Sequence, residues 1–370
     1  MKKFERSVVS LGNIGYMTEV FNKVKNEGKL NMVYLGGSIT QGCHATVTEN
    51  RYVDLSAQWW KNRFPQAEIE YFNAGIGATT SQFGAARAPI HVLDKKPDLV
   101  FVEFSVNDEA DTFFMETYES LIRRLLKDEN VKAVILINNL FYDSGRNAQD
   151  IHNGVGKHYQ LPIVSVRDHI YPLLTDGTEE VSEYTEDMLH PKDKGHRLIA
   201  DIIGELLDTE YELYEKSSKQ AQKPKLPEAL TRCRFEDAYI FNNLNCQPQT
   251  NGFEADTHTS DYFSDPFKNG WTASKKGDSI TFEVTGSVLM IQWRRTINKP
   301  APIASAVIDG NTDKKVILDA NFEETWGDLC ALTTLSDDLD KTRPHTLTIT
   351  VEQEGEAGDF MLISVISADK

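Results

Sequence analysis

The sequence predicts an α/β protein: a three-layer α/β/α domain built on a parallel sheet, followed by an all-β sandwich. Three observations carry this prediction. In residues 1–215, short apolar runs alternate with segments of helical periodicity, as in a parallel sheet covered by helices on both faces. Residues 216–228 are polar and contain two prolines, as expected of a linker. In residues 229–370 the helical period gives way to short β-rich runs with turn signals.

Five apolar runs in the first domain are predicted as strands and five periodic segments as helices. The strands are 32–35, 69–73, 99–104, 131–137 and 162–166. The helices are 17–27, 51–63, 113–126, 147–159 and 193–214. We expect Gly28 to end the first helix and Asn50 to cap the second. The run 131–137 is apolar on both faces, which favours a buried strand.

The second domain contains six clear strand signals in about 130 residues. They are 279–284, 287–293, 303–308, 315–318, 346–351 and 360–366. Thr285-Gly286 separates the first two runs and suggests a hairpin turn between them. Short strands at this spacing predict an antiparallel sandwich.

The composition of the chain indicates which classes of binding partner and which cellular compartment to expect. The net charge of −17 argues against nucleic acid and anionic membranes as partners, because both repel an acidic chain. We find no apolar run long enough for a signal peptide or a membrane span, and we expect a cytoplasmic protein. The four cysteines lack Cys-x-x-Cys spacing, so we expect reduced thiols, with Cys233–Cys246 the one pair worth checking. A homo-oligomer is possible.

The most informative stretch is the strand that ends in Gly36-Gly37-Ser38. This order places a serine hydroxyl on a tight turn at the carboxyl edge of the sheet, where open α/β sheets bind ligands. Taken alone, the triplet is also compatible with an ordinary turn whose serine caps a helix.

Three further stretches fall where the same sheet edge is expected. The small-residue loop 73–80 would let backbone N–H groups approach a ligand, although it also fits an ordinary βα loop. Asn107 follows a strand end and could offer its amide to an oxyanion, or simply form a turn. Asp187 precedes His190 by three residues, so its carboxylate can hold Nδ1 of the ring and leave Nε2 to face a nucleophile.

Together these stretches resemble the four sequence blocks of the SGNH (GDSL-like) hydrolase family over roughly residues 30–210. The blocks read Gly36-Gly37-Ser38-Ile39-Thr40, Asn73-Ala74-Gly75-Ile76-Gly77-Ala78-Thr79-Thr80, Val106-Asn107-Asp108 and Asp187-Met188-Leu189-His190-Pro191. Two positions depart from the family pattern. Gly37 stands where many members have aspartate, and Ala78 stands where many have the oxyanion glycine, so we assign the oxyanion N–H to Gly77, with Ala78 as the alternative.

The resemblance implies a flavodoxin-like sheet and acyl transfer in two steps. Ser38 would attack an ester, His190 would take its proton, and Asp187 would fix the ring. The oxyanion would be bound by the N–H groups of Ser38 and Gly77 and by the amide of Asn107. Neither a metal nor another cofactor is needed.

The presence of the second, β-rich domain favours a sugar ester as the substrate. An SGNH domain followed by a jelly-roll-like sandwich resembles the two-domain carbohydrate O-acetyl esterases, above all acetyl-mannan esterases, whose second domain is like a carbohydrate-binding module. The resemblance implies plant-derived acetylated manno- or xylo-oligosaccharides as substrate. A broader acyl-esterase or thioesterase, and a sugar-binding protein with an inert hydrolase domain, are the alternatives. Trp326, in a polar loop, is the candidate sugar-binding residue, whereas Trp271 is expected to pack structurally.

Other residues near these motifs carry weaker expectations. Cys43 and His44 follow the serine turn and could line the mouth of the site. Asp108 is expected to cap the helix that follows it rather than to contact substrate. His152 lies on a predicted helix, where a surface position is the default.

Overall fold

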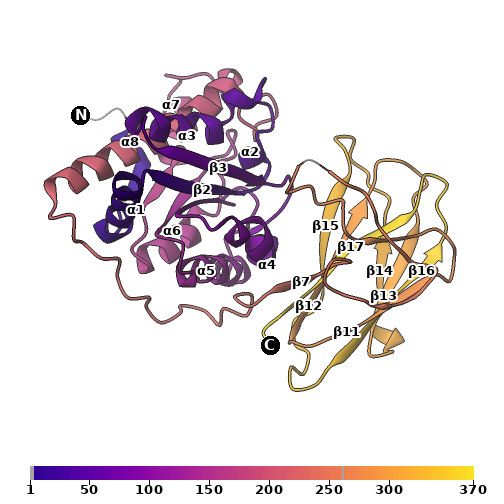
Figure 1. The fold of residues 1–370 in the computed structure, drawn as a ribbon. Coiled ribbons are helices and arrows are strands. Elements are labelled where there is room, and N and C mark those ends of the chain that lie inside the picture. Colours follow the sequence, from indigo (N-terminus) through magenta and orange to yellow (C-terminus); the bar gives the residue numbers. More distant parts are fainter. Residues whose placement is uncertain (1–3, 261) are drawn as a thin grey trace. The chain divides into compact units, whose positions relative to one another are not determined.

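The computed structural model describes residues 4–260 and 262–370 and divides into two compact units, Met1–Cys233 and Arg234–Lys370 (Figure 1). The first unit contains a six-stranded sheet with helices on both faces, and the second contains two antiparallel sheets. Within the described residues, none of the helices is long and apolar enough to cross a membrane. The α/β-plus-β fold class is therefore confirmed.

The first sheet has the strand order β1-β6-β5-β4-β2-β3, in which all neighbours are parallel except the edge pair β1–β6. Leaving out β1, this is the flavodoxin-like order 2-1-3-4-5. The strands are β1 (Val8–Ser10), β2 (Lys29–Gly36), β3 (Glu68–Gly75), β4 (Leu99–Glu103), β5 (Ala133–Asn138) and β6 (Ile163–Ser165). β4 and β5 are buried along their whole length, which explains their continuous apolar sequences.

The helices form two layers, with α1, α3 and α8 packed together on one face and α4, α5 and α6 on the other (Figure 1). Their bounds are α1 (Ile14–Glu27), α2 (Ser38–Gln41), α3 (Tyr52–Arg63), α4 (Ser81–His91), α5 (Thr112–Lys127), α6 (Gln149–His158), α7 (Val166–Thr175) and α8 (Asp193–Lys216). Gly28 ends α1 in the left-handed region (φ 67°), as predicted. The chain places β3 on one side of β2 and β4 on the other, so the strand order reverses at β2. The carboxyl ends of β2 and β4 therefore form the crevice where such folds bind ligands.

One local prediction in this unit was wrong, and some elements, among them α4 and β1, were not predicted. Asn50 does not cap α3, because its side chain binds Thr46 and Asp193 instead. Helix α4 shows no apolar period in the sequence, because it is buried on almost every side and so lacks the apolar stripe of a surface helix. The edge strand β1 is only three residues long, too short to show an alternating pattern.

The second unit is a sandwich whose sheets have the orders β15-β12-β17-β10-β9, with β7 also paired to β17, and β14-β13-β16-β11-β8. The strands are β7 (Tyr239–Phe241), β8 (Gln249–Asn251), β9 (Glu254–Ala255), β10 (Trp271–Ala273), β11 (Ser279–Val284), β12 (Val288–Arg295), β13 (Ile303–Ile308), β14 (Val316–Asp319), β15 (Leu329–Ser336), β16 (His345–Gln353) and β17 (Phe360–Ala368). The inner faces of both sheets form one hydrophobic core.

The predicted hairpin at Thr285-Gly286 is wrong. β11 pairs with β16 and β8, whereas β12 pairs with β15 and β17, so the two runs belong to different sheets. Gly286 adopts a φ of 120° at this crossing, a conformation that suits glycine. A glycine turn between two β runs therefore connects the two layers here.

The segment that follows α8 binds along the first unit as a strap, residues 217–233. Its backbone accepts hydrogen bonds from Asn22 at Lys219 and from Arg123 at Pro227. Further along, the backbone N–H groups of Leu230 and Thr231 donate to the buried carboxylate of Glu119 at 2.7 Å each. The four cysteines, all within the described residues, are free thiols.

Candidate active site

The turn after β2 holds Ser38 at the sheet edge. β2 ends at Gly36, Gly37 adopts φ −87° and ψ −148°, and Ser38 is the first residue of the short helix α2. The Ser38 side chain is nearly buried, with the residue 7% exposed. Because the first N–H groups of a helix have no acceptor within it, the N–H of Ser38 points out of the α2 ladder and is available to a ligand.

The loop before α8 brings Asp187 and His190 to Ser38. His190 Nε2 lies 2.8 Å from Ser38 Oγ, and His190 Nδ1 lies 2.6 Å from Asp187 Oδ2. The other oxygen of Asp187 accepts the backbone N–H groups of Leu189 (3.0 Å) and His190 (2.7 Å) and the hydroxyl of Thr185 (3.2 Å). The carboxylate thus folds back onto its own loop and fixes the ring, as the spacing predicted.

These donors keep Asp187 ionised. Partial burial alone would raise the pKa of Asp187, but the hydrogen bonds from the ring and the backbone N–H of His190, together with that of Leu189, hold it well below its usual range. An ionised Asp187 requires a proton on Nδ1 of His190, so Nε2 is left as an acceptor for the Ser38 hydroxyl. This arrangement can deprotonate a serine as it attacks a carbonyl carbon.

The glycine loop lies beside Ser38. A Cβ placed on Gly77 would lie 3.7 Å from Ser38 Cβ, so the N–H of Gly77 is close to the serine. It donates at 2.9 Å to the side-chain oxygen of Gln41, the last residue of α2. An amide oxygen of the protein therefore occupies the position at which this N–H would meet a substrate oxygen. The neighbouring Ala78 has a φ of 55°, in the left-handed region that glycine adopts without strain.

Asn107 completes the group of candidate oxyanion donors and explains Gly37. A Cβ on Gly37 would overlap with Oδ1 of Asn107 and lie 3.3 Å from its Nδ2, so the amide packs directly against the serine turn. Among the described residues no hydrogen-bond partner is found for the buried Oδ1. Any side chain at position 37, including the aspartate of many SGNH members, would displace this amide.

Comparison with known proteins agrees with this geometry. The GDSL-like Lipase/Acylhydrolase family matches residues 34–198, from β2 into α8. The crystal structure of a two-domain esterase (CEX) active on acetylated mannans is similar with a TM-score of 0.94 and 41% sequence identity, over 100% of this chain and 99% of that chain. The chain belongs to the GDSL-like lipase/acylhydrolase family. It is accordingly a carboxylic ester hydrolase.

Two further relatives were found. The same type of esterase, co-crystallized with mannopentaose, gives a TM-score of 0.93 at 41% identity, over 100% of this chain and 98% of that chain. An uncharacterized lipoprotein of Bacillus subtilis (strain 168), YqeF, is 34% identical over 90 residues, which are 23% of this chain and 35% of that protein. The chain thus matches about a third of the length of this relative.

Two buried ionisable residues support the serine turn of this GDSL-like hydrolase, and sequence reasoning missed both. Arg87 of α4 donates to the carbonyl oxygens of Ala74 (2.6 Å) and Gly36 (2.9 Å), at the ends of β3 and β2. Glu103, the last residue of β4, accepts long hydrogen bonds from Thr40 (3.5 Å) and Ser105 (3.4 Å). Burial raises the pKa of Glu103 to about 7, and the Asp108 carboxylate acts in the same direction. Both residues could have been found in the sequence, because each is a charged residue inside a stretch of mainly apolar or small residues.

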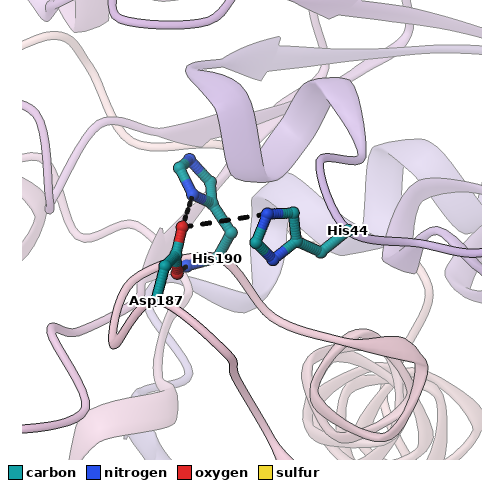
Figure 2. Close-up of side chains that lie close together, drawn as sticks. All are labelled: His44, Asp187 and His190. Atoms are coloured by element: carbon teal, nitrogen blue, oxygen red, sulfur yellow. Dashed lines mark hydrogen bonds and ion pairs between the residues drawn. The ribbon is translucent and has the colours of Figure 1, made fainter. Parts of the chain in front are cut away.

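The loop between Ser38 and α3 carries His44 into the site, as expected for a residue at its mouth. His44 Nε2 lies 3.8 Å from Asp187 Oδ2, the same oxygen that contacts Nδ1 of His190 (Figure 2). The buried ring of His196 holds this loop, since its Nε2 donates to the carbonyl of Cys43 at 3.1 Å. Burial lowers the pKa of His196 to about 4, so the ring stays neutral and keeps this role.

Asp108 and His152 differ from their predictions. Asp108 accepts the backbone N–H of Ser81 at the start of α4 (2.9 Å), so it caps an earlier helix, while Asp111 caps the helix that follows. His152 is fully buried, with Nε2 3.1 Å from Asp108 Oδ2. Its ring stacks on that of Tyr118 with centroids 3.6 Å apart, so its partners lie inside the fold.

The two tryptophans of the second unit lie in different environments. Trp271 is 3% exposed and packs edge-on against Phe282 in the sandwich core, as expected of a structural residue. Trp326 is 58% exposed in the loop between β14 and β15 and packs edge-on against Phe322, with centroids 5.1 Å apart. Its ring is therefore available to a ligand.

Proposed function

We propose that the protein is a serine-dependent carbohydrate acetylesterase that removes O-acetyl groups from manno- or xylo-oligosaccharides. The observation that carries this proposal is the chain Ser38–His190–Asp187 joined by hydrogen bonds of 2.8 and 2.6 Å. The full-length similarity to an esterase active on acetylated mannans supports the choice of substrate. The co-crystallized mannopentaose of the second structure supports an oligosaccharide rather than a lipid.

In the proposed first step, Ser38 Oγ attacks the acetyl carbonyl carbon while its proton passes to His190 Nε2. The negative charge on the carbonyl oxygen is stabilised by the N–H groups of Ser38 and Gly77 and by the Asn107 amide, and each such donor contributes on the order of 3 kcal/mol. For the Gly77 donor to act, the side chain of Gln41 must first release it. His190 then protonates the departing sugar oxygen, which leaves an acetyl group on Ser38.

In the second step a water molecule takes the place of the sugar. His190 removes its proton as it attacks the acetyl-enzyme, and acetate leaves as Ser38 regains its hydrogen. Asp187 holds Nδ1 throughout and stabilises the transient imidazolium, and it does not itself take the proton. Apart from water, no step requires a group that this chain does not supply.

The decisive measurement is acetate release from acetylated manno- and xylo-oligosaccharides, compared with the hydrolysis of butyryl and longer esters. We expect a preference for acetylated sugars, and loss of all hydrolysis in Ser38→Ala. Ser144→Ala, which removes an exposed serine of the same unit, is the matched control and should behave like wild type. Equal rates on all acyl chains would favour a broad acyl-esterase, and no hydrolysis by wild type would favour an inert, sugar-binding protein.

We further propose that the second unit binds the glycan through Trp326, whose exposed ring can stack on the apolar face of a sugar. Trp326→Ala should raise KM for acetylated oligosaccharides. Leu244→Ala, which removes another exposed apolar side chain of the same unit, should leave KM unchanged. Unchanged kinetics for Trp326→Ala would rule out this role.

A further inference from the structure

Two imidazoles lie near the same carboxylate oxygen of Asp187. Figure 2 shows the contacts from this oxygen to His190 and to His44. The distances from Asp187 Oδ2 are 2.6 Å to His190 Nδ1 and 3.8 Å to His44 Nε2. The two rings are tilted toward each other, with centroids 5.2 Å apart. Only the contact with His190 belongs to the acyl-transfer geometry, so the second imidazole has no role in the steps above.

The position of His44 is fixed by the fold. His44 has a φ of 64°, in the left-handed region, which is uncommon for a residue with a side chain. The loop is held on either side, because His196 binds the Cys43 carbonyl and Asp193 accepts both the backbone N–H (2.9 Å) and the hydroxyl (2.6 Å) of Thr46. A strained residue on an anchored loop is brought beside the carboxylate.

Two imidazoles and a carboxylate are a ligand set typical of zinc in proteins. One donor atom from each of the three residues lies within 4.8 Å of the others. Zinc–nitrogen and zinc–oxygen bonds of about 2.0–2.1 Å in a tetrahedral site place donors roughly 3.3 Å apart. The side chains of Asp187 and His44 are 40% and 38% exposed, so small rotations at the protein surface could close the site.

We propose that Zn²⁺ binds reversibly to His44, Asp187 and His190 and thereby switches the esterase off. The metal would take the place of the proton on His190 Nδ1, which is released to solvent, while the fourth position stays open to water. The bound charge would make Nε2 a weaker base, and Asp187 would no longer orient the ring. The inhibitory effect rests on the proposed function, whereas the binding of the metal does not.

The thiol of Cys43 is the neighbouring side chain that could compete as a ligand. Its sulfur does not belong to the group of donor atoms that lie within 4.8 Å of one another. Cys43→Ser is therefore the matched control for His44→Gln, because it changes a neighbouring ligand type on the same loop.

Binding is tested first, by calorimetry with ZnCl₂ on full-length Ser38→Ala. We expect one Zn²⁺ per chain. Adding His44→Gln should weaken the affinity by more than about 100-fold, since a lost ligand should cost at least as much as a lost outer-shell contact. Adding Cys43→Ser should leave the affinity unchanged, and Mg²⁺, which prefers oxygen ligands, should not bind. Absence of zinc binding, or full affinity without His44, would overturn the site.

Inhibition is tested on the wild-type protein. Zn²⁺ should abolish ester hydrolysis and EDTA should restore it, and the inhibitory concentration should rise more than about 100-fold in His44→Gln, measured against that variant's own uninhibited rate. Full activity with zinc bound would overturn the switch. If no ester is hydrolysed at all but zinc still binds through His44, the proposed function fails and the metal site stands.

Discussion

The replacement Asp187→Asn tests the central geometry most directly. The amide oxygen of asparagine can still accept the backbone N–H groups of Leu189 and His190, which Asp187 Oδ1 now accepts at 3.0 and 2.7 Å. The loop should therefore keep its shape. The amide NH₂, however, would face His190 Nδ1, and two donors cannot share that contact.

The magnitude follows from the tautomer that this change imposes. With NH₂ in the place of Oδ2, His190 is most stable with its proton on Nε2, so the atom that faces Ser38 at 2.8 Å can no longer accept a proton. The corresponding change in a serine protease triad lowers kcat about 10⁴-fold. Four factors of ten correspond to about 5.4 kcal/mol of transition-state stabilisation. KM should change little, because substrate binding does not use this proton.

The assay is the steady-state hydrolysis of p-nitrophenyl acetate by wild type, Asp187→Asn and Thr185→Val. The last variant is the control, since it removes only the 3.2 Å hydroxyl bond to the same carboxylate. It should cost far less than 10⁴-fold, because a hydrogen bond to a charged group contributes about 1.5–3 kcal/mol. Circular dichroism checks that each variant is folded. A kcat for folded Asp187→Asn within tenfold of wild type would refute the assignment of the triad.

Three further predictions address the residues around Ser38. Gln41→Ala should raise kcat/KM up to about fivefold, because the Gly77 N–H no longer has to break a neutral hydrogen bond; a decrease would mean that Gln41 positions the substrate. Gly37→Asp, the residue of many SGNH members, should lower kcat by at least about 10²-fold by displacing the Asn107 amide, and wild-type kinetics would contradict this. Glu103 keeps its proton up to about pH 7 in the folded state but loses it near pH 4.5 when unfolded, so wild type should lose about 3 kcal/mol of stability as pH rises through this range. In Glu103→Gln the loss of stability between pH 5 and pH 8, measured by urea unfolding, should disappear. If wild type and Glu103→Gln lose the same stability between these pH values, Glu103 is not the residue responsible.

The sequence alone was sufficient to predict the buried strands and the four motif residues that form the site. Apolar runs such as 99–104 predicted the buried strands, because a strand covered on both faces can be read from composition alone. Ser38, Asn107, Asp187 and His190 each lie next to a strand end or a helix start, and parallel strands bring such positions to one edge. The structure places all four together.

The supporting residues could not be predicted in this way. His44 was expected at the mouth of the site, but its contact with Asp187 was not, because it depends on a left-handed backbone that this residue type does not favour. Arg87 lies on α4, a helix buried on almost every side and therefore without an apolar period. In the second unit, the turn at Gly286 was compatible with either a hairpin or a change of sheet, and only the pairing of distant strands decides between them.

The strap that follows α8 determines where this chain can be divided. Glu119 is fully buried, and its carboxylate accepts the hydroxyls of Tyr159 and Thr231 and the two backbone N–H groups at 230 and 231. A fragment that ended with α8 would keep the carboxylate and lose all the donors that residues 230–231 supply, and an ion buried without its partners costs several kcal/mol. An autonomous hydrolase half should therefore extend to Cys233, and its yield of folded protein should fall sharply when the terminus is moved back to Lys216.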